Sequence, residues 1–267
     1  MATPSFKDIQ YEKSGGVATI TINRPKVLNA FTDQTLFEMI AAFNDAAEDR
    51  EVGVVVLTGA GDRAFSAGGD VKWEKEGGQK AYYVMQPDVH YAMRMCLKPV
   101  IAKVKGYAIG GGHHLAYFCD LTIAADNGVF GQNGARVGSP ADTYLVSYLA
   151  RVVGQKRARE IWYLCRRYSA EEAFQMGLVN AVVPLDKLDE EVDRWCEDLL
   201  DKSPTVLRVL KQSFEAEGDL HRLPLFHYQR LLSPDFLESP ENREGQVAFL
   251  DKRDPDFRQF RAKAGQA

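Results

Sequence analysis

The sequence predicts an α/β protein with a largely parallel sheet, and two observations support this prediction. The segments 52–58, 100–104 and 121–124 are nearly continuous apolar runs rich in β-branched residues. Such strands are typical of parallel sheets, which are buried on both faces. Segments with a helical spacing of apolar residues separate these strands, and an alternation of strands and helices favours an α/β core.

The N-terminal elements follow from their patterns in chain order. Residues 9–12 and 17–23 alternate or run apolar, and the turn-forming segment Ser-Gly-Gly at 14–16 lies between them, which predicts a β-hairpin. A helix is expected from about Thr32 to Arg50, because its apolar residues recur every three or four positions. Two more helices are expected, one in the 80s and early 90s and one over 115–118.

The C-terminal third of the chain is expected to be helical. Ser169 and Ser203 suit helix N-caps, and Gly177 suits a C-cap. The separate apolar stripes of these helices need a surface to cover them, which favours homo-oligomerisation. The segments with a helical pattern are 144–165, 170–176, 188–200 and 204–214.

Composition excludes several classes of function. Of the 267 residues, 45% are hydrophobic and 26% are charged, which is typical of one globular core with or without a smaller appendage. The formal net charge of −4 gives no sign of nucleic-acid binding. The N-terminus lacks an export signal, and no apolar run reaches the roughly 20 residues that span a bilayer. We therefore expect a cytoplasmic protein that binds neither nucleic acid nor membrane.

Neither the cysteines nor the histidines suggest a metal site. The adjacent His113 and His114 lack the i, i+4 spacing that suits a metal-binding pair on a helix. The cysteines have no metal-binding spacing and predict reduced core thiols. They are Cys96, Cys119, Cys165 and Cys196.

Two glycine-rich turns, each of which follows an apolar strand along the chain, are the clearest functional signal. Gly110, Gly111 and Gly112 lie where a strand is expected to become a helix, and Gly68 and Gly69 lie in a similar turn. Glycine lets the backbone approach a ligand closely, and a helix N-terminus offers unpaired N–H groups. Two such turns can direct two N–H donors at one oxygen, as stabilisation of an enolate or oxyanion requires. The contiguous glycines match neither a dinucleotide-binding fingerprint nor a phosphate-binding P-loop.

Together with these turns, an ordered set of motifs resembles the crotonase (enoyl-CoA hydratase/isomerase) superfamily. The resemblance implies a ClpP-like spiral of ββα units with a helical C-terminal region. It divides the chain into an acyl-CoA-binding core over 1–200 and a helical trimerisation region over 201–267, and it implies a homotrimer or a hexamer made of two trimers. The matching segments are 21–25 with 29–30, 55–70, 98–102, 106–120, 130–132, 173–184 and 244–253.

The resemblance also implies which residues meet the substrate. Members of the superfamily direct the thioester carbonyl of an acyl-CoA at two backbone N–H groups, which by position are those of Gly69 and Gly111. No cofactor is implied beyond the coenzyme A of the substrate. The residues implied to bind the substrate are Arg24, Lys26, Ala64, Ala67, Asp70, Gln132, Gly134, Ser139, Tyr144, Trp162 and Lys252. For each charged residue of this binding set the alternative is a solvated surface charge, and for each aromatic residue it is an ordinary core residue.

Within the superfamily, segments 130–139 and 158–168 are most similar to 2-ketocyclohexanecarboxyl-CoA hydrolase and 1,4-dihydroxynaphthoyl-CoA synthase. Both enzymes break or make a C–C bond beside a ketone in a CoA ester. Typical hydratases carry two catalytic glutamates where this chain has His114 and Gly134, so an ordinary enoyl-CoA hydratase is not expected. An aspartate of the synthase is replaced by Ala141, which argues against ring formation.

Asp142 and His114 are the candidate acid/base residues. Isomerases of the superfamily and 4-chlorobenzoyl-CoA dehalogenase carry a catalytic aspartate at the position of Asp142, while the alternative is a helix N-cap after Ser139. His114 titrates near neutrality and suits a general acid or base, while the alternative is an interior histidine.

These residues predict an enzyme that opens the ring of an alicyclic 2-ketoacyl-CoA by hydrolytic C–C cleavage. His114 and Asp142 would activate water and return a proton. Three alternatives stay open: a double-bond isomerase that uses Asp142, a hydratase that uses His114, and a non-catalytic subunit that binds a CoA ester.

Overall fold

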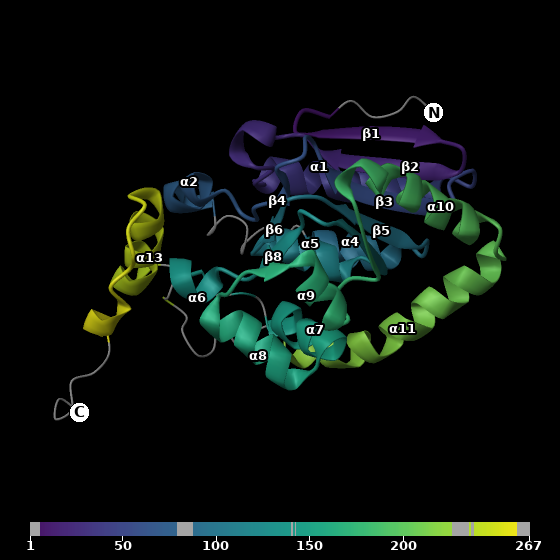
Figure 1. Ribbon diagram of the computed structural model, residues 1–267. Coiled ribbons are helices and arrows are strands. Elements are labelled where there is room, and N and C mark those ends of the chain that lie inside the picture. The colour runs from purple at the N-terminus through teal and green to yellow at the C-terminus, as the bar shows by residue number, and fades with distance from the viewer. Residues whose placement is uncertain are drawn as a thin grey trace.

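A six-stranded sheet forms the centre of the fold, with the spatial strand order β1-β2-β3-β5-β7-β10 (Figure 1). The predicted hairpin is present, because β1 and β2 pair antiparallel, and every other pairing in this sheet is parallel as predicted. The strands are β1 (Ile9–Ser14), β2 (Val17–Ile22), β3 (Val54–Gly59), β5 (Val100–Val104), β7 (Leu121–Ala125) and β10 (Ala181–Val183).

This computed structural model describes residues 6–78, 88–139, 141, 143–225, 235 and 238–260. Within these ranges, each of the four cysteines is free, as predicted. No helix in the described part of the chain combines the length and the apolar character that crossing a membrane requires.

A second sheet of four very short strands packs beside the first and carries the two glycine turns. Its order is β4-β6-β8-β9, and its pairings are parallel except for that of β8 with β9. Strands this short have too few residues to show a period, which is why the sequence pattern did not reveal them. They are β4 (Ala64–Ser66), β6 (Tyr107–Ile109), β8 (Val129–Gly131) and β9 (Tyr168–Ser169).

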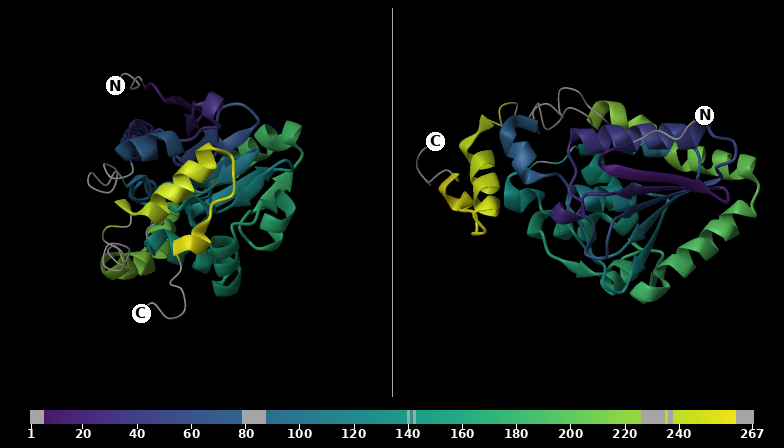
Figure 2. Two further views of the ribbon diagram at one scale, coloured as in Figure 1. Left: turned by 90° about the vertical axis from the view of Figure 1, so that its left-hand side faces the viewer. Right: turned by 90° about the horizontal axis from the view of Figure 1, so that it is seen from above.

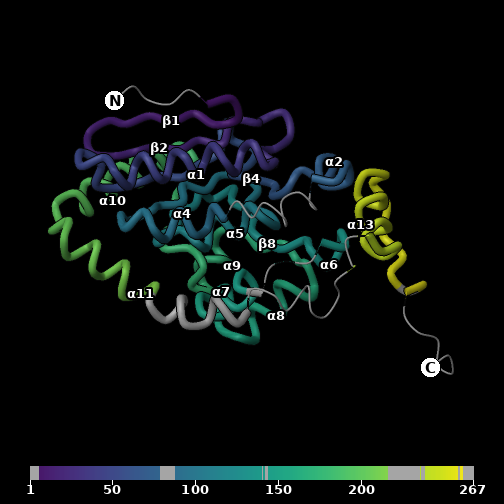
Figure 3. Tube along the Cα trace, turned by 180° about the vertical axis from the view of Figure 1, so that it is seen from behind, coloured from purple at the N-terminus to yellow at the C-terminus, as the bar shows by residue number. Residues whose placement is uncertain are grey.

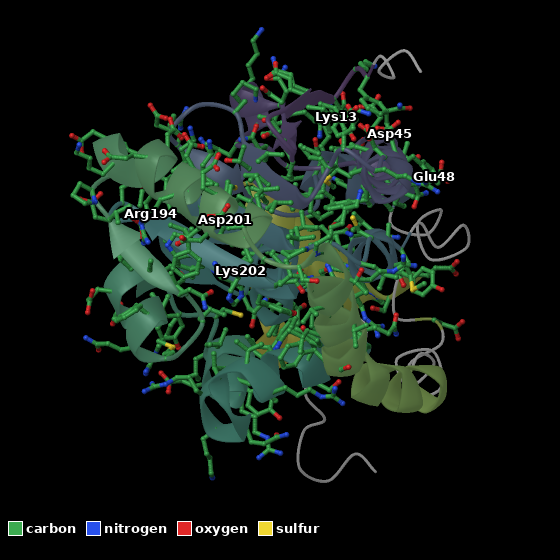
Figure 4. The ribbon with its side chains drawn as sticks, turned by 90° about the vertical axis from the view of Figure 1, so that its right-hand side faces the viewer. Lys13, Asp45, Glu48, Arg194, Asp201 and Lys202 are labelled. Carbon is green, nitrogen blue, oxygen red and sulfur yellow. The ribbon has the colours of Figure 1, made fainter. Side chains whose placement is uncertain are left out.

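Helices cover both faces of the central sheet, so its strands are buried on both sides. Val55 and Leu57 of β3 point to the core shared with α1 (Asp33–Glu48), α4 (Val89–Met95) and α5 (Gly111–Phe118). The alternate residues Val54 and Val56 pack on the other face against α10 (Leu188–Leu200). At the edge of the sheet, Lys13 of β1 pairs with Asp45 of α1 at 2.9 Å (Figure 4).

The second half of the chain is helical, with one break that the pattern did not predict. The expected helix over 144–165 divides at Gly154, whose φ of +77° suits glycine, into α7 and α8. Ser169 caps α9 as predicted, because its hydroxyl accepts a hydrogen bond from Glu172 N. The helices are α6 (Gly134–Val137), α7 (Thr143–Val153), α8 (Gln155–Leu164), α9 (Ala170–Gln175), α11 (Pro204–Leu225) and α13 (Pro240–Leu250).

The C-terminal helix α13 lies at the opposite end of the molecule from α10 and from the start of α11 (Figures 1 and 3). It packs beside α6 and beside the short helix α2 (Val71–Trp73), which continues into the π-helical turn η2 (Glu74–Gly78) (Figure 2). Three 3₁₀ turns complete the described elements: η1 (Pro25–Val27), η3 (Leu185–Lys187) and η5 (Phe257–Phe260).

Candidate active site

The two glycine turns meet because β4 and β6, the strands that precede them, are parallel neighbours. Gly68 has a φ of +93°, and a β-carbon added there would lie only 2.7 Å from the backbone nitrogen of Gly111. Hydrogen bonds of 2.9 Å from Phe31 N to Gly68 O and from Asp70 N to Phe31 O fix the first turn. The close contact between Gly68 and Gly111 therefore requires glycine at position 68 and keeps the two turns side by side.

Each turn presents a backbone N–H group that has no acceptor among the described residues. The Gly69 amide donates no hydrogen bond to any residue that the structure describes. Gly111 is the first residue of α5, so its N–H has no acceptor within the helix. The positive end of the helix dipole adds to its attraction for negative charge. Two free donors that lie this close together can bind one oxyanion.

A cavity of about 980 Å³ lies along both turns and collects most of the residues that the sequence singled out. Two of the predicted residues that the structure describes are not on its wall, and a third cannot be placed. Arg24 and Ala64 are absent from the lining, and Asp142 lies outside the described residues. Those that line it are Lys26, Ala67, Gly69, Asp70, Gly111, His114, Gln132, Gly134, Ser139, Tyr144, Trp162 and Lys252.

Arg24 supports the first turn instead of lining the cavity. Its Nη2 lies 3.3 Å from Asp70 Oδ2 and its Nε lies 3.6 Å from Asp8 Oδ2, and it also donates to the carbonyl of Ala30. These contacts tie the segment before α1 to the turn that carries Gly69. Ala64 is buried in β4, where its carbonyl accepts a hydrogen bond from the side chain of Asn29.

Gln132 joins the two adjacent histidines of α5. Its Nε2 lies 2.9 Å from Nδ1 of His113, which is fully buried, and its Oε1 lies 3.2 Å from Nε2 of His114. Because an amide NH₂ donates and an amide oxygen accepts, His114 carries its proton on Nε2 and a lone pair on Nδ1. The amide of Gln132 thus sets the tautomer of the histidine that lines the cavity.

Burial keeps both histidines neutral. It lowers the pKa of His113 to about 3, with a smaller contribution from Arg167. It also lowers the pKa of His114 well below its usual value, and His90 and His113 contribute in the same direction. The expectation that His114 titrates near neutrality is therefore wrong, and at neutral pH it offers an uncharged imidazole with a lone pair on Nδ1.

Glu74, which the sequence did not single out, lies on the same cavity wall. A β-carbon at Gly69 would clash with the carboxyl oxygen Oε1 of Glu74, so this carboxyl group lies directly against the first turn. Burial and the neighbouring Asp70 raise the pKa of Glu74 to about 7. In the sequence it stands in the charged run 72–76, which is typical of a solvated helix and gave no signal.

Aromatic side chains form the deeper wall of the cavity. The ring of His114 lies 5.4 Å from that of Trp162, and the ring of Tyr144 lies 5.5 Å from the guanidinium carbon of Arg94. Arg94 is itself buried and paired with Glu215 of α11. This part of the wall is therefore largely apolar, and the buried guanidinium of Arg94 is neutralised by the buried carboxylate of Glu215.

Two backbone N–H donors, a neutral histidine and a half-buried carboxyl group are together the groups that can bind an oxyanion and exchange protons with a substrate. The family model of enoyl-CoA hydratase/isomerase matches residues 12–261, and the chain belongs to this family of acyl-CoA-processing enzymes.

Solved structures agree with this assignment. An enoyl-CoA hydratase from Mycobacterium avium subsp. paratuberculosis K-10 is 31% identical over 95% of this chain and 99% of its own, with a TM-score of 0.85. A carnitinyl-CoA hydratase from Mycobacterium avium is 29% identical over 96% of this chain and 100% of its own, also with a TM-score of 0.85. A monofunctional enoyl-CoA isomerase from M. smegmatis is 34% identical over 79% of this chain and 94% of its own, with a TM-score of 0.68. The predicted crotonase-type α/β fold is confirmed.

Proposed function

We propose that this protein opens the ring of an alicyclic 2-ketoacyl-CoA by hydrolytic C–C cleavage. The observation that carries the proposal is His114, a neutral imidazole on the cavity wall three residues after the free N–H of Gly111. It occupies a position where typical hydratases, by the family resemblance, carry a catalytic glutamate. Gln132 holds it in the tautomer that a general base requires.

In the proposed reaction, the N–H groups of Gly69 and Gly111 hold the thioester oxygen. His114 takes a proton from water while the water oxygen attacks the ring ketone. The C–C bond between that carbon and Cα then breaks, and its electron pair forms a thioester enolate at the two N–H groups. Protonation of Cα completes an acyl-CoA with a new carboxyl group. These steps need only protein groups and water.

The second hydratase position gives a steric argument against ordinary hydration. A β-carbon at Gly134 would lie 2.5 Å from the carbonyl oxygen of Ser139, so this turn has no room for a side chain. A glutamate there cannot be restored without moving the backbone. Where typical hydratases have two carboxylates that hold water, this chain therefore has the imidazole of His114 and, at Gly134, no side chain.

Coenzyme A is proposed to enter at the side of the cavity that carries Lys26 and Ala67. Lys26 and, after α13, Lys252 supply positive charge there for its phosphate groups. The acyl group then extends past Gly69 and Gly111 toward Tyr144 and Trp162. Asp142 remains a candidate for returning a proton.

Double-bond isomerisation is a second candidate function, and Glu74 favours it. A single carboxyl group beside the thioester can carry a proton between Cα and Cγ without any water. One of the similar solved structures is itself described as an enoyl-CoA isomerase.

A panel of CoA esters analysed by mass spectrometry in water labelled with heavy oxygen separates these functions. We expect an alicyclic 2-ketoacyl-CoA to gain one labelled water, and the variant His114→Gln to lose at least about 10²-fold in this turnover. Conversion of a monounsaturated ester without a change in mass, and no gain of water by the keto ester, would establish isomerisation instead. Tight binding without turnover of any ester would establish the non-catalytic alternative.

A further inference from the structure

Hydrogen bonds hold the backbone of Glu74 in a fixed position relative to Gly69. Glu74 N donates a 2.9 Å hydrogen bond to Asp70 O, and Asp70 N donates to Phe31 O. The Asp70 carboxylate also accepts hydrogen bonds from the backbone of Lys72 and Trp73, which fixes the turn into α2. The segment from Gly69 to Glu74 is therefore one bonded unit, and its carboxyl group faces the proposed thioester site.

The other carboxylates of the cavity wall already have structural partners. Asp70 pairs with Arg24 and caps α2, and Asp88 caps α4 through the backbone of Tyr91. The Glu74 carboxyl group makes no hydrogen bond or ion pair within the described ranges. It is thus the carboxyl group of this wall that stays available to a substrate.

We propose that Glu74 is the catalytic acid/base that moves the proton at Cα of the CoA ester. With the thioester oxygen at Gly69 and Gly111, Cα lies two bonds from that oxygen, beside the carboxyl group that lies against Gly69. The carboxylate takes the Cα proton, the C–H electron pair becomes the enolate, and the enolate oxygen keeps its two N–H donors. In reverse, the carboxylic acid returns a proton to Cα. This role rests on the proposed function only in the placing of the thioester, because any acyl group with an α-proton meets Glu74.

The electrostatic surroundings of Glu74 suit this role. Burial and Asp70 raise its pKa to about 7, so the acid and the carboxylate coexist at neutral pH, as efficient proton transfer in both directions requires. Of the groups across the cavity, His114 is neutral and Arg94 is paired with Glu215. The other titratable and charged groups on the cavity wall are Lys26 of η1, Arg63 before β4, Asp70 and Lys72 beside Glu74, Asp88 before α4, His90, Tyr91 and Arg94 of α4, Tyr107 of β6, His114 of α5, Tyr144 of α7, Arg167 before β9 and Lys252 after α13.

Exchange of the α-proton in deuterium oxide tests this role directly. The probe is cyclohexanecarboxyl-CoA, which has one α-proton, no ketone and no double bond, and so undergoes neither proposed reaction. Mass spectrometry of the wild type with this probe should show uptake of one deuterium, at a rate that rises with pH through about 7 as Glu74 ionises. Glu74→Gln should slow the exchange by at least about 10²-fold and remove this pH dependence.

Two further variants make the test specific. Glu76→Gln removes the same charge from an exposed residue of the same turn and should exchange like the wild type. Gly69→Ala keeps the amide donor but displaces the Glu74 carboxyl group, and it should also slow exchange. Exchange by Glu74→Gln at the wild-type rate, or loss of exchange in His114→Gln alone, would overturn the proposal. Exchange of this probe by the wild type, together with no ring opening of an alicyclic 2-ketoacyl-CoA in a separate assay, would leave Glu74 in this role and remove the hydrolase function.

Discussion

Two glycines, Gly68 and Gly69, shape this site because they have no side chain. A side chain at Gly68 would meet the backbone of Gly111, and one at Gly69 would meet the carboxyl group of Glu74. The space that the glycines leave brings two N–H donors and one carboxyl group together. On the other side, Gln132 orients the imidazole of His114 through a bond that joins β8 to α5. The site thus depends on backbone packing as much as on its polar side chains.

The buried His113 should make the stability of the protein depend on pH. Its pKa is 6.5 in an unfolded chain and about 3 in the fold, so between these values only the unfolded state binds the proton. The free energy of unfolding should therefore fall as pH decreases below about 6.5, by up to ~1.4 kcal/mol per pH unit from this residue. Urea unfolding from neutral to mildly acidic pH measures the slope. An equal slope in wild type and His113→Asn would contradict this assignment.

The candidate site was predictable where its signal is local. Glycines that follow apolar strands predicted the two turns, and the family resemblance singled out His114, which lies on the cavity wall. The bridge through Gln132 was not predictable, because residue 132 meets α5 only after the short strand β8 has paired with β6. Glu74 was missed for a different reason, since its charged neighbours are typical of a solvated helix.

Among the elements, long strands and capped helices were predictable, whereas the second sheet and the break at Gly154 depend on tertiary packing. One residue of helix α11, Lys211, attaches this helix to the rest of the fold. Lys211 is nearly buried and donates to the carbonyls of Met93 and Lys98 and to Asp120 Oδ2, the last at 2.8 Å. A single ammonium group therefore connects α11 to the end of α4 and to the chain before β7.

Loss of this ammonium group should destabilise the attachment of α11. Lys211→Met keeps most of the side-chain volume but leaves two carbonyls without their donor and removes the charge partner of Asp120, which costs about 3 kcal/mol. Lys202→Met is the matched control, because Lys202 is exposed at the turn between α10 and α11 (Figure 4). The two variants are compared by denaturant unfolding. A loss for Lys211→Met no larger than that of the control would refute the anchoring role.

At the scale of the whole molecule, the single chain leaves apolar side chains of its C-terminal region in solvent. Phe214 is 81% exposed, and Val209 and Val206 on the same helix are 58% and 54% exposed. Phe249 of α13 is 49% exposed. Exposed apolar side chains gathered on one helix are typical of surfaces that contact another protein. It supports the proposal that copies of this chain assemble through their C-terminal helices as a trimer or a hexamer.

A charge placed on this surface should weaken the assembly. We expect the wild type to have the mass of a trimer or hexamer by light scattering, and Phe214→Glu to shift it toward smaller species, because the new carboxylate would be buried without a partner. Gln10→Glu adds the same charge at an exposed position of β1 and should leave the mass unchanged. A monomeric wild type, or an unchanged mass for Phe214→Glu, would count against this interface.

The vibrational frequency of a bound thioester carbonyl tests most directly whether Gly69 and Gly111 form an oxyanion-binding site. With cyclohexanecarboxyl-CoA as a ligand that is not converted to another compound, Raman difference spectra of the wild type should show the carbonyl stretch at lower frequency than in water, because two N–H donors polarise it. Gly111→Val places a side chain against Phe31 and turns this donor away, so it should lose the shift and about 10²–10³ in turnover while still binding coenzyme A. A carbonyl frequency in the wild type equal to that in water, or one unchanged by Gly111→Val, would contradict the site.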